Sequence, residues 1–188
     1  MKPLTDEIPP ALADHTRHAS LRASIIDHLF LGELLRCLWA HGFRGIELLR
    51  AEVDAAGYDI LIECNGIARH IQLKSSYSGA KTDRVPVNAA LAAKASGCVV
   101  WIKFDPDTMR LGPYLWLGDA PGKPVALGDR LGRHSRGPIG AKRVRPNIRI
   151  VHRSSFSVLD CMEDLAIRLF GSAANDEVHP HVSQKAKT

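Results

Sequence analysis

The chain has 188 residues, of which 45% are hydrophobic and 24% are charged, an ordinary balance for a globular protein with one well-buried core. No apolar run reaches the ~20 residues that cross a bilayer, and the N-terminal residues lack the apolar stretch of a signal peptide, so we expect no membrane contact and a cytoplasmic location. The four cysteines lack metal-ligand spacing and predict buried thiols rather than zinc or disulfides, and the net charge of +5 favours a polyanionic partner.

The first predicted element is a helix from about His18 to His41, because apolar residues recur there at helical spacing and Gly42 follows as a stop. Residues 1–16 are polar and predict a loose arm. Glu33 lies one turn from apolar residues of this helix, and a carboxylate in such a setting requires a partner. A metal, a lysine or an ion pair with Arg36 or Arg22 would each meet that need.

A short strand at 45–50 precedes two alternating segments, 58–63 and 69–74, that flank Asn65-Gly66, a strong signal for a two-residue hairpin turn. This turn places Cys64 opposite Ile67 and therefore Asp59 opposite Gln72. One face of the hairpin would be apolar, and the other would carry Asp59, Glu63, His70, Gln72 and Lys74 as solvated or functional side chains.

The remaining elements complete an α/β order. We expect a polar loop at 75–84, an Ala-rich helix at 88–95, and a central strand at 98–104 because that run is continuously apolar. A strand at 114–117 and a helix at about 158–170, with Ser157 as its N-cap, follow. Residues 17–171 would form a single domain with a mixed sheet and helices on its faces, and residues 172–188 predict a disordered tail.

A basic segment precedes the last helix and contains no acid after Asp129. Its members are Arg130, Arg133, His134, Arg136, Lys142, Arg143, Arg145, Arg149 and Arg153. Glycine and proline interrupt this segment, so we interpret it as a flexible polycationic loop that contacts DNA phosphates, although a solubilising surface is the alternative.

Glu33, the Gly57-Tyr58-Asp59 segment and Gln72-Leu73-Lys74 together resemble the motif residues of the PD-(D/E)XK nuclease superfamily, over roughly residues 20 to 105. The glutamine resembles the Q-x-K variant of Mrr-like restriction enzymes and of some group I intron homing endonucleases. The resemblance implies a restriction-endonuclease-like mixed central sheet flanked by helices. It also implies a metal-dependent DNA endonuclease that hydrolyses phosphodiester bonds in defence, repair or a mobile element.

By this resemblance, Asp59 would be the main ligand of Mg²⁺ or Mn²⁺, Gln72 and the Leu73 carbonyl would add oxygen ligands, and Lys74 would act on the attacking water. Glu33 would be an outer or second-metal ligand. A neutral glutamine ligand predicts weak metal affinity. Glu63, His70 and Asp54 are secondary candidates.

Several side chains around this set are candidates for DNA contact, because hydroxyls and cations make most backbone-positioning contacts. They are Ser75, Ser76, Lys81, Arg84, Lys142, Arg143 and Arg145. If the domain cuts both strands with one site per chain, a homodimer is the expected state. The alternatives are a catalytically silent protein of this fold that binds nucleic acid or a protein partner, and an unrelated α/β protein.

Overall fold

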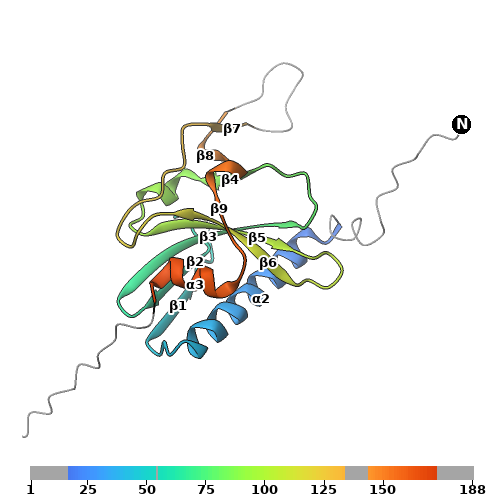
Figure 1. Cartoon of the computed structure of the whole chain (residues 1–188). Coiled ribbons are helices and arrows are strands. Elements are labelled where there is room, and N and C mark those ends of the chain that lie inside the picture. Colours follow the sequence, from blue (N-terminus) through green and yellow to red (C-terminus); the bar gives the residue numbers. More distant parts are fainter. Residues whose placement is uncertain (1–16, 54, 134–143, 173–188) are drawn as a thin grey trace, which may run out of the picture.

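The structure is a computed structural model that describes residues 17–53, 55–133 and 144–172. Its centre is a mixed six-stranded sheet flanked by helices (Figure 1). In spatial order the strands are β1 (Ile46–Arg50), β2 (Ile60–Cys64), β3 (Ile67–Tyr77), β5 (Gly97–Phe104), β6 (Leu111–Gly118) and β9 (Ser157–Leu159). Only the β3–β5 pair is parallel. The predicted α/β class and the predicted central position of β5, buried along its whole length, are therefore confirmed.

Both α-helices pack on one face of this sheet. Helix α2 (Ala19–Ala40) contributes Ile26, Phe30 and Leu34 to a core that it shares with α3 (Met162–Phe170). The predicted first helix is confirmed, and it ends where Gly42 takes a positive φ of 89° that suits glycine.

A second, three-stranded sheet covers the opposite face. It consists of β4 (Arg84–Asn88), β8 (Val144–His152) and β7 (Leu131–Arg133), with a 3-10 turn η1 (Ala89–Ala93) after β4. A separate core that includes Val87, Leu91 and Trp101 fills the space between the two sheets. Of the two alternatives for the polar face of the hairpin, solvated or functional, the solvated one is wrong at Gln72, which this second layer buries.

The Asn65-Gly66 hairpin is confirmed in turn and, as far as Ile60, in register. Asn65 and Gly66 have φ angles of 50° and 75°, the positive values that a type I′ turn needs. Cys64 pairs with Ile67, and Ile60 pairs with Ile71. The register ends there, because the Asp59 N–H also donates to the Ile71 carbonyl, so the predicted pairing of Asp59 with Gln72 is wrong by one residue.

Two expectations between residues 75 and 95 are wrong. Ser75 and Ser76 belong to β3, which continues to Tyr77, so the polar loop is shorter than expected. The expected helix at 88–95 is the short turn η1, capped by the Asn88 side chain, which accepts a hydrogen bond from the Ala90 N–H. The strand before it, β4, contains Pro86 and lies at the edge of the small sheet, where a proline is tolerated.

The basic segment and the start of the last helix also differ from expectation. Leu131–Arg133 and Val144–His152 are paired strands rather than parts of a flexible loop. The turn η2 (Arg153–Ser155) leads into β9 at Ser157, and α3 begins only at Met162. Its predicted end at Phe170 before Gly171 is confirmed.

Some expectations fall outside the described residues. These are the arm at 1–16, the tail from 173 onward, Asp54, His134, Arg136, Lys142 and Arg143. All four cysteines are free; three are buried as expected, whereas Cys161 is exposed, which corrects that expectation. Within the described parts of the chain, no helix is both long and apolar enough to cross a membrane.

Candidate functional site

Asp59 stands where the hairpin ladder ends, one residue before β2. Its backbone N–H donates to the Ile71 carbonyl at 2.9 Å, and its carbonyl accepts from the Ala51 N–H at 3.0 Å. Gly57, two residues earlier, has a φ of 81°, and a side chain there would lie 2.6 Å from the Leu91 nitrogen. The sheet on both sides and the close approach to η1 therefore fix the backbone of Asp59.

Beyond the end of β2, the Asp59 carboxylate accepts the hydrogen bond that a backbone carbonyl of a neighbouring strand would otherwise accept. Its Oδ2 accepts a hydrogen bond of 2.6 Å from the Leu73 N–H. In a strand the N–H and C=O of one residue point to the same side, so the Leu73 carbonyl faces the same edge. One carboxylate and one backbone carbonyl thus converge where β2 no longer covers β3.

A hollow of about 200 Å³ opens at this point between β3 and helix α2. Its lining consists of Ala23, Asp27, Asp59, Leu73, Lys74, Ser75 and Ile102. Ala23 and Asp27 lie four residues apart and therefore on the same side of α2. The hollow thus combines two carboxylates, a lysine, a hydroxyl and an apolar wall.

The electrostatics of the hollow centre on Asp27. Burial raises the pKa of Asp27 above its usual value, and the negative charge of Asp59 raises it further. Arg50, His28 and Lys74 act in the opposite direction, and the Arg50 guanidinium lies 3.5 Å from the Asp27 carboxylate. Two acids close enough to repel each other form a place where a cation would be stabilised.

Gln72 follows Ile71, whose carbonyl accepts from the Asp59 N–H, but Gln72 does not line the hollow. Its side chain is only 1% exposed, and its Oε1 accepts a hydrogen bond of 3.0 Å from the Asn88 N–H, on the side of the small sheet. The structure therefore separates Gln72 from the other predicted ligands, because β4 and η1 bind the amide that the hairpin alone would leave in solvent.

Glu33 also lies apart from the hollow. Its Oε2 accepts a hydrogen bond of 2.9 Å from the Tyr114 hydroxyl. Burial, followed by this bond, raises the pKa of Tyr114. The structure thus gives the half-buried Glu33 a tyrosine of β6 as a partner, and among the described residues no lysine or arginine forms an ion pair with it.

The remaining candidates divide between the two sides of β3. Ser75 lines the hollow, whereas Ser76 accepts hydrogen bonds from Trp101 and Lys103 on the small-sheet side. Arg84 is exposed and pairs with Asp83 at 2.8 Å.

Lys81, Arg145 and Glu63 are exposed. His70 packs against the Tyr58 ring, and its Nδ1 lies 3.0 Å from the Ala95 carbonyl. None of these four residues lines the hollow.

Sequence reasoning missed Asp27. Asp27 lies within the apolar face of α2, since Leu31, Leu34 and Leu38, which follow it by four, seven and eleven residues, are all buried. That spacing is the signal that could have identified it. The packing of α2 against the end of β3 then brings Asp27, and not Glu33, to the hollow with Asp59 and Lys74.

The donor set suits a hard divalent cation in part. Carboxylate and carbonyl oxygens are the ligands that Mg²⁺ prefers, and Asp27, Asp59 and Leu73 offer them at one edge. However, no group of three or more His, Cys, Asp or Glu side chains gathers as a metal site among the residues that the structure describes. A cation would therefore need backbone, water or substrate oxygens to complete its coordination.

Neither the protein-family models nor the curated proteins compared with this chain gave a match.

Proposed function

We propose that the protein is a metal-dependent DNA endonuclease of the PD-(D/E)XK type, which hydrolyses phosphodiester bonds in the hollow between α2 and β3. One observation carries the proposal. Asp59 and Lys74, predicted to lie on the same face of the hairpin, line one hollow together with a further carboxylate from the first helix, Asp27.

Each of these side chains has a role in such a reaction. A bound Mg²⁺ would neutralise charge on the scissile phosphate and lower the pKa of a water molecule. Asp59, Asp27 and the Leu73 carbonyl would hold the ion. Lys74 would orient the water and offset the negative charge that develops as its oxygen bonds to phosphorus and an ester oxygen leaves with a proton.

The test is cleavage of supercoiled, linear and branched DNA in Mg²⁺ or Mn²⁺. We expect Asp59→Asn and Lys74→Met each to lower the cleavage rate about 100-fold or more. Asp107→Asn and Lys123→Met make the same changes at exposed positions and should cleave as the parent does. Cleavage that survives both site substitutions would refute the proposal.

A silent protein of the same fold is the second candidate. The engagement of Gln72 with Asn88 favours it, because the motif position that would supply a third ligand is already occupied. No cleavage of any substrate, together with salt-sensitive DNA binding, would support this candidate.

A further inference from the structure

The face of the main sheet that carries the small sheet holds a buried cation with no anionic partner. Lys103 of β5 is 7% exposed, and its Nζ donates a hydrogen bond of 2.8 Å to the Ser76 hydroxyl. The same ammonium lies 4.4 Å from the centre of the Trp101 ring. Among the described residues, no ion pair involves Lys103.

The surroundings of Lys103 disfavour its charge further. Burial lowers the pKa of Lys103, and the nearby positive charge of Arg153 lowers it again. A buried ammonium usually has a carboxylate partner or coordinates an anion. An anion supplied from outside the chain would relieve this unfavourable arrangement.

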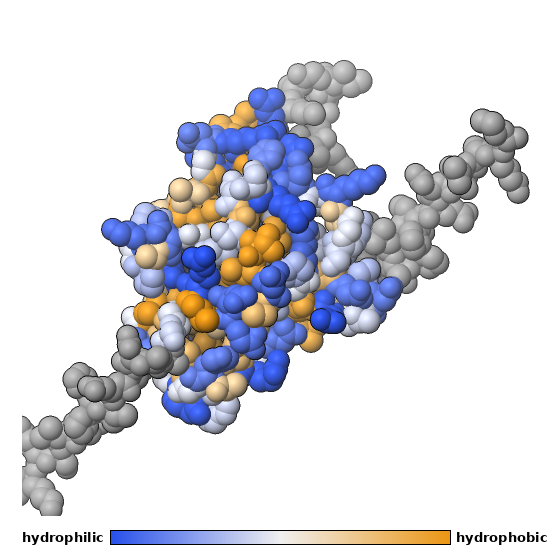
Figure 2. Space-filling model, in the orientation of Figure 1, coloured by the Kyte–Doolittle hydropathy of each residue, from blue (hydrophilic) through white to orange (hydrophobic). Residues whose placement is uncertain are grey.

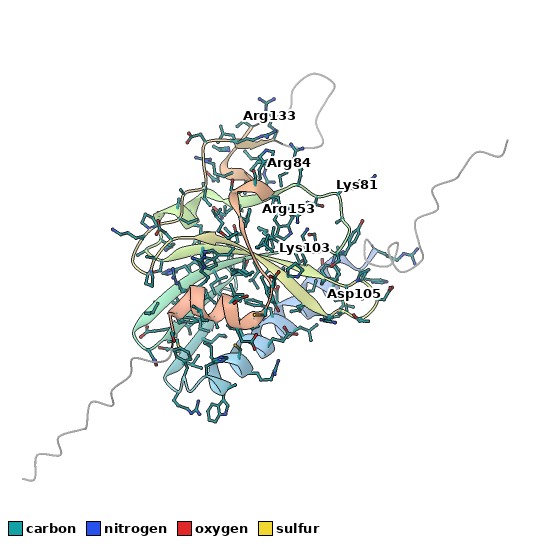
Figure 3. All side chains as sticks on the ribbon, in the orientation of Figure 1. Lys81, Arg84, Lys103, Asp105, Arg133 and Arg153 are labelled. Carbon is teal, nitrogen blue, oxygen red and sulfur yellow. The ribbon has the colours of Figure 1, made fainter. Side chains whose placement is uncertain are left out.

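More cations continue from Arg153 onto the small sheet. The Arg153 N–H donates to the Asp83 carbonyl at 2.7 Å, and Asp83 is followed by Arg84, the first residue of β4. Arg84 shares with Arg130 and Arg133 a hollow of about 660 Å³, more than three times the volume of the one beside Asp59. Figure 3 shows Lys103, Arg153, Arg84 and Arg133 following one another from the middle of the molecule toward β7.

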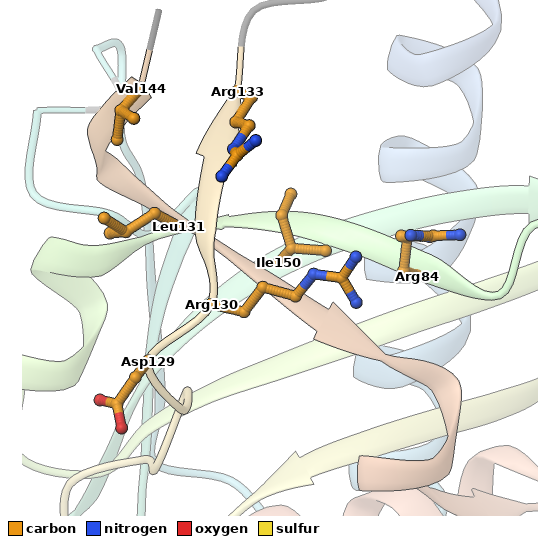
Figure 4. Close-up of a pocket in the computed structure, with 7 residues that line it drawn as sticks. All are labelled: Arg84, Asp129, Arg130, Leu131, Arg133, Val144 and Ile150. Carbon is orange, nitrogen blue, oxygen red and sulfur yellow. The ribbon is translucent and has the colours of Figure 1, made fainter. Parts of the chain in front are cut away.

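The lining of this larger hollow is basic and open. Three arginines face one acid, Asp129, which lies at the opposite end from Arg84 (Figure 4). Three apolar side chains, Leu131, Val144 and Ile150, complete the wall, and Leu131 and Val144 are exposed. Hydrophilic side chains predominate over this part of the surface in Figure 2.

We propose that Ser76, Lys103, Arg153, Arg84, Arg130 and Arg133 form a cationic track that binds the phosphate backbone of a nucleic acid beside the cleavage hollow. The track begins next to the candidate site along the chain, since Ser76 directly follows Lys74 and Ser75, which line the hollow, while its own hydroxyl lies on the small-sheet side of β3. It rests on the proposed function for the class of substrate, and it identifies the contacts that hold that substrate.

A polymer of regularly spaced phosphates fits the track better than a single small anion. The cations extend from a buried lysine to exposed arginines over two sheets, and arginine forks match phosphate oxygens. Leu131 and Val144 would contact sugars or bases. Such contacts are mostly independent of sequence and depend strongly on salt.

The test is fluorescence anisotropy of labelled DNA and RNA of the same sequence, in EDTA so that nothing is cut. We expect the pair Arg84→Gln with Arg133→Gln to weaken DNA binding about 10-fold or more and to lower the log–log salt slope by about 2. Lys103→Met should weaken binding about 10-fold. Arg153→Gln, at an exposed position, replaces that variant if Lys103→Met fails to fold.

The matched control is the pair Arg168→Gln with Lys123→Gln, which removes two exposed positive charges outside the track. We expect its affinity and salt slope to change little. Equal losses on DNA and RNA support phosphate contact. Wild-type affinity of the track variants, losses as large in the control pair, or dependence on the same arginines only for anionic lipid vesicles would each overturn the proposal.

The two proposals fail in different ways. If Asp59→Asn abolishes cleavage while the track variants bind and cut as the parent does, the track is refuted and the nuclease stands. If no DNA is cut but the track variants lose binding, the nuclease is refuted and the track stands.

Discussion

Among the described residues, each face of the central sheet buries one cationic side chain, Arg69 or Lys103. The two differ in how many hydrogen-bond acceptors surround them. On the helical face, Arg69 donates to the carbonyls of Leu169, Asp119 and Arg168 at 2.7, 2.9 and 3.0 Å. On the small-sheet face, Lys103 has one hydroxyl and one aromatic ring. A guanidinium whose three nitrogens each donate to a carbonyl stabilises the fold, because two of those carbonyls belong to the last turn of α3. A partly satisfied ammonium remains available for a ligand.

The largest effect that tests this contrast is the loss of Arg69. Arg69→Met would leave its carbonyl acceptors without their donor, and we expect it to lower the free energy of unfolding by about 3 kcal/mol. Urea unfolding at neutral pH measures the change. Arg168→Met, at an exposed position on α3, should change it by less than about 0.5 kcal/mol. A small effect of Arg69→Met would show that its bonds do not hold α3 to the sheet.

Replacing Lys103 should raise the free energy of unfolding, whereas replacing Arg69 should lower it. Burial lowers its pKa below the ordinary 10.5, so the unfolded chain binds more protons between the lowered value and pH 10.5, and stability rises with pH through that window. At neutral pH the charged lysine therefore destabilises the fold, and we expect Lys103→Met to stabilise it by about 1 kcal/mol. The difference in stability between Lys103→Met and the parent should disappear as the pH rises toward 10.5.

Lys123→Met is the control for that experiment, because Lys123 is exposed and should give no such gain. If Lys103→Met lowered stability as Arg69→Met does, the contrast between the two cations would be false.

A smaller gain in stability is expected when Asp27 in the hollow is replaced. The pKa of Asp27 is raised, so the folded chain holds its proton to higher pH than the unfolded chain does, and stability falls as the pH rises from 3.8 through the raised value. Asp27→Asn should therefore raise the melting temperature at neutral pH, and the gain should vanish below pH 3.8. Thermal unfolding across pH measures this, with Asp107→Asn as the control. A lower melting temperature would mean that the ion pair with Arg50 dominates.

Local signals in the sequence predicted the hairpin well. Asn65-Gly66 sets the register from Cys64–Ile67 to Ile60–Ile71 by itself, but the register fails at Asp59, whose N–H bonds to Ile71. The long helix and the buried strand β5 have equally strong local patterns.

The positions of Gln72 and Glu33 could not be predicted from the sequence, because contacts between distant segments determine them. The burial of Gln72 depends on Asn88, 16 residues away, and the partner of Glu33 is Tyr114, 81 residues away. The strand β4 has only Val85 and Val87 on its inner face around a proline, too little periodicity to detect. Asp27 lies within the apolar face of α2, but the pattern does not say which end of the sheet it meets until α2 is packed.

The difference between Asp27 and Glu33 gives the most direct test of the candidate site. On a DNA substrate that the protein cleaves in Mg²⁺, single-turnover rates would be compared for Asp27→Asn and Glu33→Gln. We predict that Asp27→Asn lowers the rate about 100-fold or more, because it removes a carboxylate from the hollow. Glu33→Gln should cut within a few-fold of the parent. A parental rate for Asp27→Asn, with the loss in Glu33→Gln instead, would contradict the placement of catalysis in this hollow.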